Sequence, residues 1–289
     1  MPVCRPFRPS LPASFRLQPL VLAAALAIPA AASAEPIQEG KTVSYKVRNE
    51  QVQAYLVRPA KIGPTPGVVV IHEWWGLNDQ IKRVADRIAE EGFMAIAPDL
   101  YRGKIGTDAG LAHELMRGLN EGYAIEVVTG AVAHLRGIEA RERRTPTPTS
   151  PRLAVGTLGF CMGGRISLAT ALSGADVQAA VMYYGSVETN KEALAPLQIP
   201  LLGIFGNEDR GIPLDQIRAF QAALQDSGKD ATVLVYPGVG HAFFNEDRPS
   251  YDSEAAKDSW ERTKQFLRAN LLIDGAPAPA AKKPRTDLP

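Results

Sequence analysis

Three side chains that together could cleave an acyl bond each follow an apolar run of the sequence. Cys161 comes after residues 153–158, Asp209 after residues 201–205 and His241 after residues 232–236. A thiol with a reference pKa of about 8.5 is a poor nucleophile at neutral pH until a base takes its proton. An imidazole can take that proton and return it to a leaving group, while a carboxylate on its other nitrogen orients the ring. The types and order of these residues predict nucleophilic hydrolysis.

The cysteine lies in a glycine-rich stretch, Gly159-Phe160-Cys161-Met162-Gly163-Gly164. The apolar run before it predicts a buried strand, and the helical spacing of apolar residues over 165–172 predicts a helix after it. Glycines permit the sharp strand-to-helix turn that exposes a nucleophile, and the turn would aim the N–H of Met162 at negative charge developing on a substrate. A buried, inert thiol is the alternative for a lone cysteine.

The two partners of the cysteine also have simpler interpretations. Asp209 could be a turn residue that caps a helix beginning near Pro213, and its neighbour Glu208 could be the acid instead. His241 could be a turn residue between glycines. The order nucleophile, acid, base favours the catalytic interpretation, because each of the three follows its own predicted strand.

Strands that alternate with helices must position these residues. Strands are predicted at 42–47, 52–57, 67–72, 93–98, 153–158, 179–184, 201–205 and 232–236, and helical regions at 79–91, 108–137, 165–172, 213–224 and 253–272. The first two strands read as an antiparallel hairpin, and the rest predict a mostly parallel sheet with helices on both faces. Ligands of such sheets bind beyond the carboxyl ends of the strands. The polar residues that follow strands are Glu73, Asp99, Arg102, Cys161, Asp209 and His241.

The first 34 of the 289 residues are predicted to be a signal peptide. Arg5, Arg8 and Arg16 precede the apolar run 20–28, and small residues that suit a cleavage site end at Ala34. We therefore expect an exported protein, periplasmic or secreted, with a hydrolase domain at 35–273 and a disordered Pro/Ala/Lys-rich tail at 274–289. No other stretch is long and apolar enough for a membrane helix. Because Cys4 lies in the signal, the mature chain would hold a single thiol.

The charge balance gives no reason to expect a charged macromolecule as a partner. Residues 1–34 contain three Arg and no acid, so the remainder has 29 Lys and Arg against 31 Asp and Glu. We expect no nucleic acid and no anionic membrane as partners, and a small-molecule substrate bound by a monomer. The sequence shows no clustered His/Cys ligand spacing and no phosphate loop, so no metal or organic cofactor is predicted.

Five motifs together resemble one known family. They are residues 70–78 (VIHEWWGLN), 97–101 (APDLY), 159–164 (GFCMGG), 206–209 (GNED) and 240–243 (GHAF). The chain from about Lys41 to Leu272 is similar to the dienelactone hydrolase family, the carboxymethylenebutenolidases and their relatives, which have the α/β-hydrolase fold. The resemblance implies Cys161 as nucleophile, His241 as base and Asp209 as acid.

The resemblance also implies roles for residues around the cysteine. Glu73 would hold the resting thiol and release it when substrate binds, and the backbone N–H groups of Met162 and Trp74 would form an oxyanion hole. Independently, a carboxylate near the thiol would compete with the imidazole for its proton and limit oxidation. A charge near the start of the helix at Asn78 is the alternative for Glu73.

The substrate site is less fully specified by the resemblance. Family members that act on dienelactone bind its carboxylate with arginines; Arg102 falls where one could stand, and Asn245 stands where the second would be. Aromatic residues could wall the pocket, with core packing as the alternative: Trp74, Trp75, Tyr101, Tyr184 and Phe243. We expect a carboxylic ester or lactone hydrolase with a thioacyl intermediate. A non-catalytic small-molecule binding protein is the alternative, and a thiol redox protein is disfavoured because no Cys-x-x-Cys is present.

Overall fold

The computed structural model describes residues 36–60, 65–142 and 153–272. The predicted signal peptide, residues 1–34, and the predicted tail, residues 274–289, lie outside the described residues. None of the described helices is long and apolar enough to cross a bilayer.

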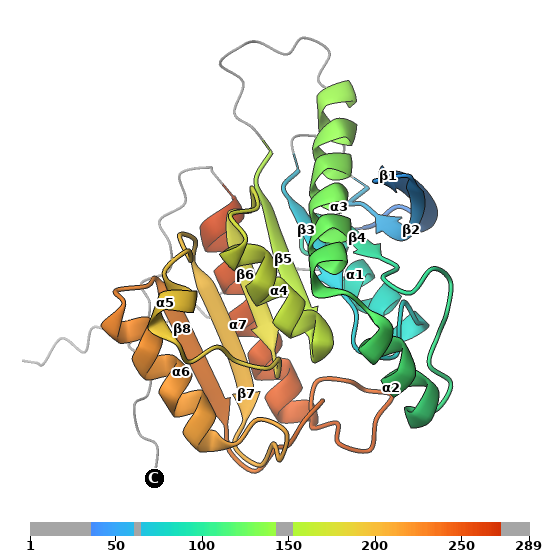
Figure 1. Cartoon of the computed structure of the whole chain (residues 1–289). Helices are drawn as coiled ribbons and strands as arrows, with labels where there is room; N and C mark the ends of the chain where they lie inside the picture. Colours follow the sequence, from blue (N-terminus) through green and yellow to red (C-terminus); the bar gives the residue numbers. More distant parts are fainter. Residues whose placement is uncertain (1–35, 61–64, 143–152, 273–289) are drawn as a thin grey trace, which may run out of the picture. The chain divides into compact units, whose positions relative to one another are not determined.

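A single eight-stranded sheet forms the centre of the fold (Figure 1), in the order β1-β2-β4-β3-β5-β6-β7-β8. The strands are β1 (Lys41–Val47), β2 (Glu50–Val57), β3 (Gly67–Ile71), β4 (Met94–Pro98), β5 (Val155–Phe160), β6 (Ala179–Tyr183), β7 (Leu201–Gly206) and β8 (Ala231–Tyr236). The pairs β1–β2 and β2–β4 are antiparallel, whereas β3 to β8 are mutually parallel. The predicted α/β-hydrolase fold with an N-terminal antiparallel hairpin is thus confirmed.

Helices cover both faces of this sheet. They are α1 (Asp79–Glu90), α2 (Ala109–Gly118), α3 (Glu121–Glu142), α4 (Met162–Leu172), α5 (Lys191–Leu194), α6 (Leu214–Asp226) and α7 (Ser253–Leu271). In Figure 1, α3, α4 and α6 lie in front of the sheet, and α1 and α7 lie behind it. Two buried clusters result, and β3 contributes to both because successive side chains of a strand point to opposite faces. Val68 and Val70 join the cluster that includes α1, whereas Val69 and Ile71 join the one that includes α3.

One predicted helical region is in fact two helices. The chain becomes extended at Leu119 (ψ 121°), which ends α2, and Asn120 then caps α3 by accepting a hydrogen bond from the Tyr123 N–H at 2.9 Å. Asn is a favoured N-cap residue because its side chain satisfies a free N–H of the first turn. The break brings the end of α2 and the start of α3 to the carboxyl edge of the sheet. The short helix α5 was not predicted.

Glycines let the turn after β5 pack against its neighbours. A Cβ atom on Gly159 would lie 1.9 Å from the carbonyl oxygen of Gly163, and one on Gly163 would lie 2.3 Å from that of Ile71. Both approaches are to backbone atoms, which cannot swing aside as a side chain can. The strand, the turn and the helix therefore pack this closely only when these positions carry no side chain.

Candidate active site

Cys161 occupies the turn between β5 and α4 in a strained backbone conformation. Its φ of 54° and ψ of −117° lie outside the regions that L-residues favour, at a cost on the order of 1–3 kcal/mol. A hydrogen bond of 3.0 Å from its N–H to the carbonyl of Tyr183 anchors the turn to β6. The side chain is partly exposed rather than buried. The structure therefore argues against the inert-thiol interpretation.

The structure brings His241 and Asp209 together beside the cysteine. His241 Nδ1 lies 2.7 Å from Asp209 Oδ2, and the other carboxylate oxygen accepts hydrogen bonds from the N–H groups of Gly211 at 2.8 Å and Ile212 at 3.2 Å. Asp209 is buried and Glu208 is exposed. Of the two acids that the sequence offered, Asp209 is thus the one that orients the imidazole.

The surroundings of His241 favour its cationic form. Burial opposes the charge, but the hydrogen bond to Asp209 and the negative charges of Asp209 and Cys161 outweigh it and raise the pKa of His241 to about 10. At neutral pH the proton therefore resides on the imidazole. A cation next to a cysteine favours the nucleophilic thiolate.

Glu73 is buried close to this group but is held by other residues. Its Oε1 accepts a hydrogen bond from the Tyr184 hydroxyl at 3.0 Å, and its Oε2 accepts one from Asn245 Nδ2 at 2.7 Å. Burial raises the pKa of Glu73, and the two hydrogen bonds and the charges of His241 and Arg248 oppose that shift. The hydrogen bonds among the described residues include none between Glu73 and Cys161, although both line the same cavity. Asn245 thus binds Glu73 in this structure.

The backbone N–H groups of Met162 and Trp74 have no protein acceptor among the described hydrogen bonds. The first belongs to the opening turn of α4, where N–H groups have no partner within the helix. The Trp74 N–H shares a peptide unit with the Glu73 carbonyl, which accepts hydrogen bonds from the Gly76 N–H at 3.2 Å and from His72 Nδ1 at 2.5 Å. These two hydrogen bonds fix the orientation of the peptide.

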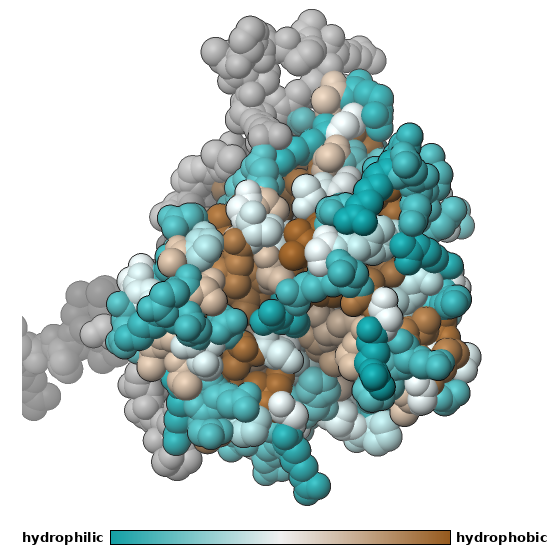
Figure 2. Space-filling model, viewed as in Figure 1, coloured by the Kyte–Doolittle hydropathy of each residue, from teal (hydrophilic) through white to brown (hydrophobic). Residues whose placement is uncertain are grey.

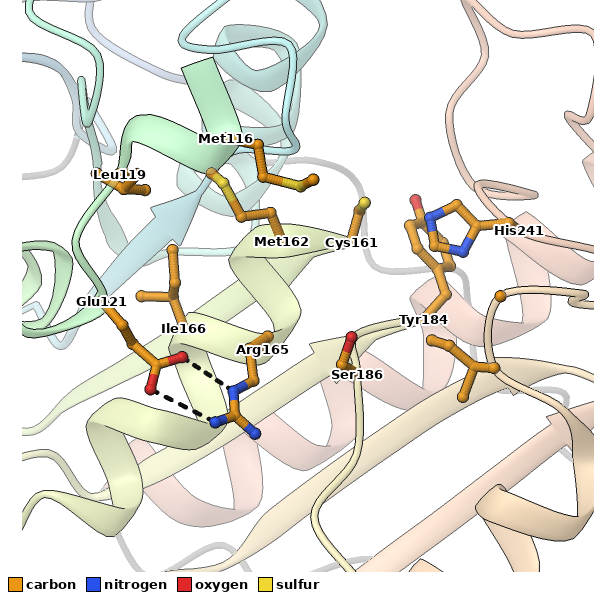
Figure 3. A pocket seen from close by; sticks show the side chains of 12 residues that line it. Met116, Leu119, Glu121, Cys161, Met162, Arg165, Ile166, Tyr184, Ser186 and His241 are labelled. Atoms are coloured by element: carbon orange, nitrogen blue, oxygen red, sulfur yellow. Dashed lines mark hydrogen bonds and ion pairs between the residues drawn. The ribbon is translucent and has the colours of Figure 1, made fainter. Parts of the chain in front are cut away.

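Two cavities meet at Cys161 and His241. The first has a volume of about 360 Å³ and is lined by Met116, Leu119, Glu121, Cys161, Met162, Arg165, Ile166, Tyr184, Ser186, Gly211, Ile212 and His241. The second has about 320 Å³ and is lined by Glu73, Trp74, Trp75, Cys161, His241, Ala242, Arg248, Pro249 and Ser250. Figure 3 shows the first cavity, with Met116 and Met162 on one side of Cys161 and Tyr184 and His241 on the other. A substrate carbonyl at Cys161 could extend one group into each.

The predicted substrate-binding residues divide between these cavities and other places. Tyr184 lines the first cavity and Trp75 the second, but Tyr101 and Arg102 line a third, which shares Leu119 with the first. Arg102 is paired there with Glu50, at 2.8 Å and 3.2 Å. The expectation was that Arg102 binds a substrate carboxylate, but it lines neither cavity at Cys161, and the carboxylate of Glu50 on β2 pairs with its guanidinium.

Phe243 is a second correction. Its side chain is fully buried, and its ring packs against those of Tyr184 and Tyr236 at 5.7 Å and 5.5 Å. It is a core residue and lines neither cavity at the cysteine.

Several lining residues were missed by the sequence analysis: Met116, Leu119, Glu121, Arg165, Ile212 and Arg248. Arg165 could have been found, because it lies four residues after Cys161 and thus one helical turn along. The residues of α2 and α3 carry no such signal, since they reach the site only through the break at Leu119. No group of three or more potential metal-ligating side chains occurs among the described residues.

A family model, curated relatives and solved structures are similar to this chain. The family model described as "Dienelactone hydrolase family" matches residues 52–271. A Methylorubrum extorquens protein named "Putative carboxymethylenebutenolidase" is 32% identical over 240 residues, covering 78% of this chain and 79% of that protein. "Protein usf" of Aquifex pyrophilus is 34% identical, covering 80% of this chain and 99% of its own. The crystal structure of a "Putative Dienelactone Hydrolase" from Klebsiella pneumoniae is 29% identical with a TM-score of 0.67, covering 81% and 99% of the two chains.

Proposed function

The chain belongs to the dienelactone hydrolase family and is a carboxylic ester hydrolase, and from this premise we propose that it cleaves its ester or lactone substrate through a thioacyl intermediate on Cys161. The observation that carries the proposal is the position of His241, which contacts Asp209 on one side and faces the partly exposed thiol of Cys161 on the other. That arrangement supplies a nucleophile, a proton carrier and an orienting carboxylate.

In the proposed first step, the thiolate of Cys161 attacks the carbonyl carbon, and a carbon–sulfur bond forms as the carbonyl π electrons move to oxygen. The proton that His241 holds is then transferred to the leaving alkoxide as the carbon–oxygen bond breaks. The alcohol departs, or in a lactone stays attached as the far end of the acyl chain. The raised pKa of His241 supports this step, because the imidazolium is already the acid that the leaving group needs.

The tetrahedral intermediate carries a negative oxygen, for which the N–H groups of Met162 and Trp74 are the proposed donors. Preorganised donors of this kind lower the barrier because they need no reorientation when the charge develops. Both groups lack protein acceptors among the described residues, and both lie on backbone fixed by neighbouring elements.

Hydrolysis of the thioester completes the proposed cycle. Neutral His241 takes a proton from water, the hydroxide oxygen bonds to the acyl carbon, and the carbon–sulfur bond breaks to restore the thiolate. The acid product leaves, and the imidazolium–thiolate pair is regenerated. The bond between His241 Nδ1 and Asp209 supports both transfers by leaving Nε2 to face the reacting groups.

We propose that Glu73 alternates between two partners. In the structure Tyr184 and Asn245 bind its carboxylate, and we assign this arrangement to the substrate-ready state, in which the thiol is released. In the resting protein it would turn to Cys161 and hold the thiol.

We also propose, from residues 1–34, that the protein is exported to the periplasm or beyond. N-terminal sequencing of the exported protein should then give Glu35 as its first residue.

Turnover of a p-nitrophenyl ester by the chain from residue 35, with and without iodoacetamide, tests the proposal. Alkylation of Cys161 should abolish turnover, and intact mass should show one acyl adduct on untreated protein caught during the reaction. Cys161→Ala and His241→Ala should lose turnover while keeping the circular dichroism spectrum. Glu208→Gln is the matched control and should retain activity, because that side chain is exposed. Full activity in Cys161→Ala, or ligand binding without turnover in the wild type, would favour the non-catalytic binding protein instead.

A further inference from the structure

The first cavity differs from a carboxylate-binding site in the character of its walls. Apolar side chains surround it: Met116, Leu119, Met162, Ile166 and Ile212. Figure 2 shows apolar surface, in brown, between hydrophilic patches on the face that α3, α4 and α6 cover. Removing an ionised carboxylate from water into such surroundings is strongly unfavourable unless a counter-charge is available there.

The charged lining residues other than His241 neutralise each other. Arg165 Nε donates to Glu121 Oε2 at 3.0 Å and Nη2 donates to Oε1 at 3.4 Å, which joins α4 to α3. Figure 3 shows both bonds, with the guanidinium lying against Glu121 and away from the sulfur of Cys161. A substrate carboxylate would have to displace Glu121 from this bidentate ion pair with Arg165. Within the pair, the carboxylate of Glu121 therefore neutralises the positive charge of Arg165.

The position of His241 determines which part of an ester enters this cavity. The leaving oxygen must receive its proton from the imidazole, so the alcohol group lies on the His241 side of the sulfur. The acyl group then extends the opposite way. In Figure 3 that direction leads to Met162 and Met116, with Leu119 and Ile166 beyond them.

We propose that the cavity selects esters with an uncharged, apolar acyl group, and that the Glu121–Arg165 pair excludes acyl groups ending in a carboxylate. This inference rests on the proposed function, since it concerns the acyl group transferred to Cys161. It adds the substrate class, which neither the fold nor the family specifies for this chain.

Two length-matched substrates test the inference. p-Nitrophenyl hexanoate and the p-nitrophenyl monoester of adipic acid differ in whether a methyl group or a carboxylate ends a six-carbon acyl chain. The wild type should prefer the hexanoate in kcat/KM by about tenfold or more, which corresponds to roughly 1.4 kcal/mol. Glu121→Gln should reduce this preference severalfold, because it leaves Arg165 free to bind the carboxylate. Arg165→Met should increase it, because the unpaired Glu121 repels the adipate ester.

Glu126→Gln is the matched control. Glu126 lies on the same helix and also pairs with an arginine, Arg48 at 2.6 Å, but neither residue lines the first cavity. The Glu126→Gln variant should prefer the hexanoate over the adipate ester in kcat/KM as strongly as the wild type does. A wild-type preference for the adipate ester, or an equal preference in Glu121→Gln and Glu126→Gln, overturns the inference. Loss of the proposed function looks different, because then neither ester is turned over or Cys161→Ala hydrolyses both.

Discussion

At the scale of single residues, the environment of His241 determines when the site is active. Its pKa in the folded protein, about 10, exceeds the ordinary value of 6.5, so the imidazolium persists until the pH rises through about 10. The carboxylate of Asp209 is one cause of that shift, because it accepts a hydrogen bond from Nδ1 and attracts the charge. The acid that we propose to protonate the leaving group should therefore be lost only at strongly alkaline pH.

Asp209→Asn should move that alkaline limit to lower pH. Without the carboxylate the pKa of His241 falls, and kcat/KM should decline at a less alkaline pH while its maximum drops about 10³-fold. The measurement is kcat/KM between pH 6 and 11 with blanks for uncatalysed hydrolysis. Alkylation of Cys161 by iodoacetamide, followed in parallel, should stay fast above the limit because this reaction needs no proton from His241. An unmoved alkaline limb would contradict the assignment of that limb to His241.

His72 is a positioning residue for the proposed oxyanion hole. Its Nε2 faces the Leu100 N–H at 3.2 Å and must accept, so Nδ1 carries the hydrogen that it donates to the Glu73 carbonyl. Burial lowers the pKa of His72 and keeps it neutral in this tautomer. It thereby holds the peptide whose N–H belongs to Trp74.

Replacing His72 should reduce kcat more than it changes KM. His72→Leu removes the donor and should lower kcat about 10–100-fold, since one lost oxyanion donor costs about 10²–10³-fold. His72→Asn keeps a donor at the Nδ1 position and should recover part of the loss. Rates should be normalised to the folded fraction, measured by circular dichroism, so that unfolded protein does not lower the apparent kcat. A proportional rise in KM with unchanged kcat would exclude this positioning role.

Sequence reasoning located Cys161, Asp209 and His241 because each follows a strand, and strand ends converge at one edge of a parallel sheet. It misplaced Arg102, because the partner of that arginine is Glu50 on β2, a contact between residues far apart in the sequence. Phe243 was assigned to the pocket for a different reason. An aromatic residue beside the histidine has the same local sequence pattern whether it packs in the core or lines a pocket.

At the scale of elements, the junction of β5 and α4 is the least tolerant part of the fold. Gly163→Ala would place a Cβ 2.3 Å from the carbonyl oxygen of Ile71, so α4 must shift away from β3. We expect a loss of about 1–3 kcal/mol in the free energy of unfolding, measured by urea titration. Gly118→Ala in α2, where a Cβ would meet nothing within 4 Å, should change stability little. Equal effects of the two substitutions on stability would contradict this explanation of the turn between β5 and α4.

The elements themselves were largely predictable, whereas the break between α2 and α3 was not. Apolar periodicity marks a buried strand or an amphipathic helix wherever it is strong, as in α1 with its face of Ile81, Val84 and Ile88. Around Leu119 the periodicity is weak, and Asn120 is an ordinary polar residue until its capping bond is seen. The walls of the first cavity depend on that break, so the pocket was less predictable than the nucleophile.

At the scale of the whole molecule, the buried Glu73 links folding to pH. Its pKa in the folded protein is raised, so the native state binds the proton more tightly than the unfolded chain and stability falls as the pH rises above about 4.5. Glu73→Gln removes that dependence. Its melting temperature should therefore rise relative to the wild type between pH 5 and 8, by roughly 2–4 °C per kcal/mol. Glu254→Gln changes an exposed residue of α7, so the difference between its melting temperature and that of the wild type should stay constant across this pH range. If the melting temperature of Glu73→Gln changed with pH as steeply as that of the wild type, another group would be responsible for the pH dependence of stability.

The meeting of two cavities at Cys161 also has a kinetic consequence. In the proposed mechanism, the acyl group remains covalently attached to Cys161 after the first step and lies in the first cavity, while the alcohol diffuses out of the second. The departing alcohol thus vacates the space through which the second reactant approaches the thioester. An ester should release its products in a fixed sequence, alcohol before acid, with ping-pong kinetics. An added alcohol such as methanol can enter that vacated space in place of water, so the same site should partition its acyl group between hydrolysis and transfer.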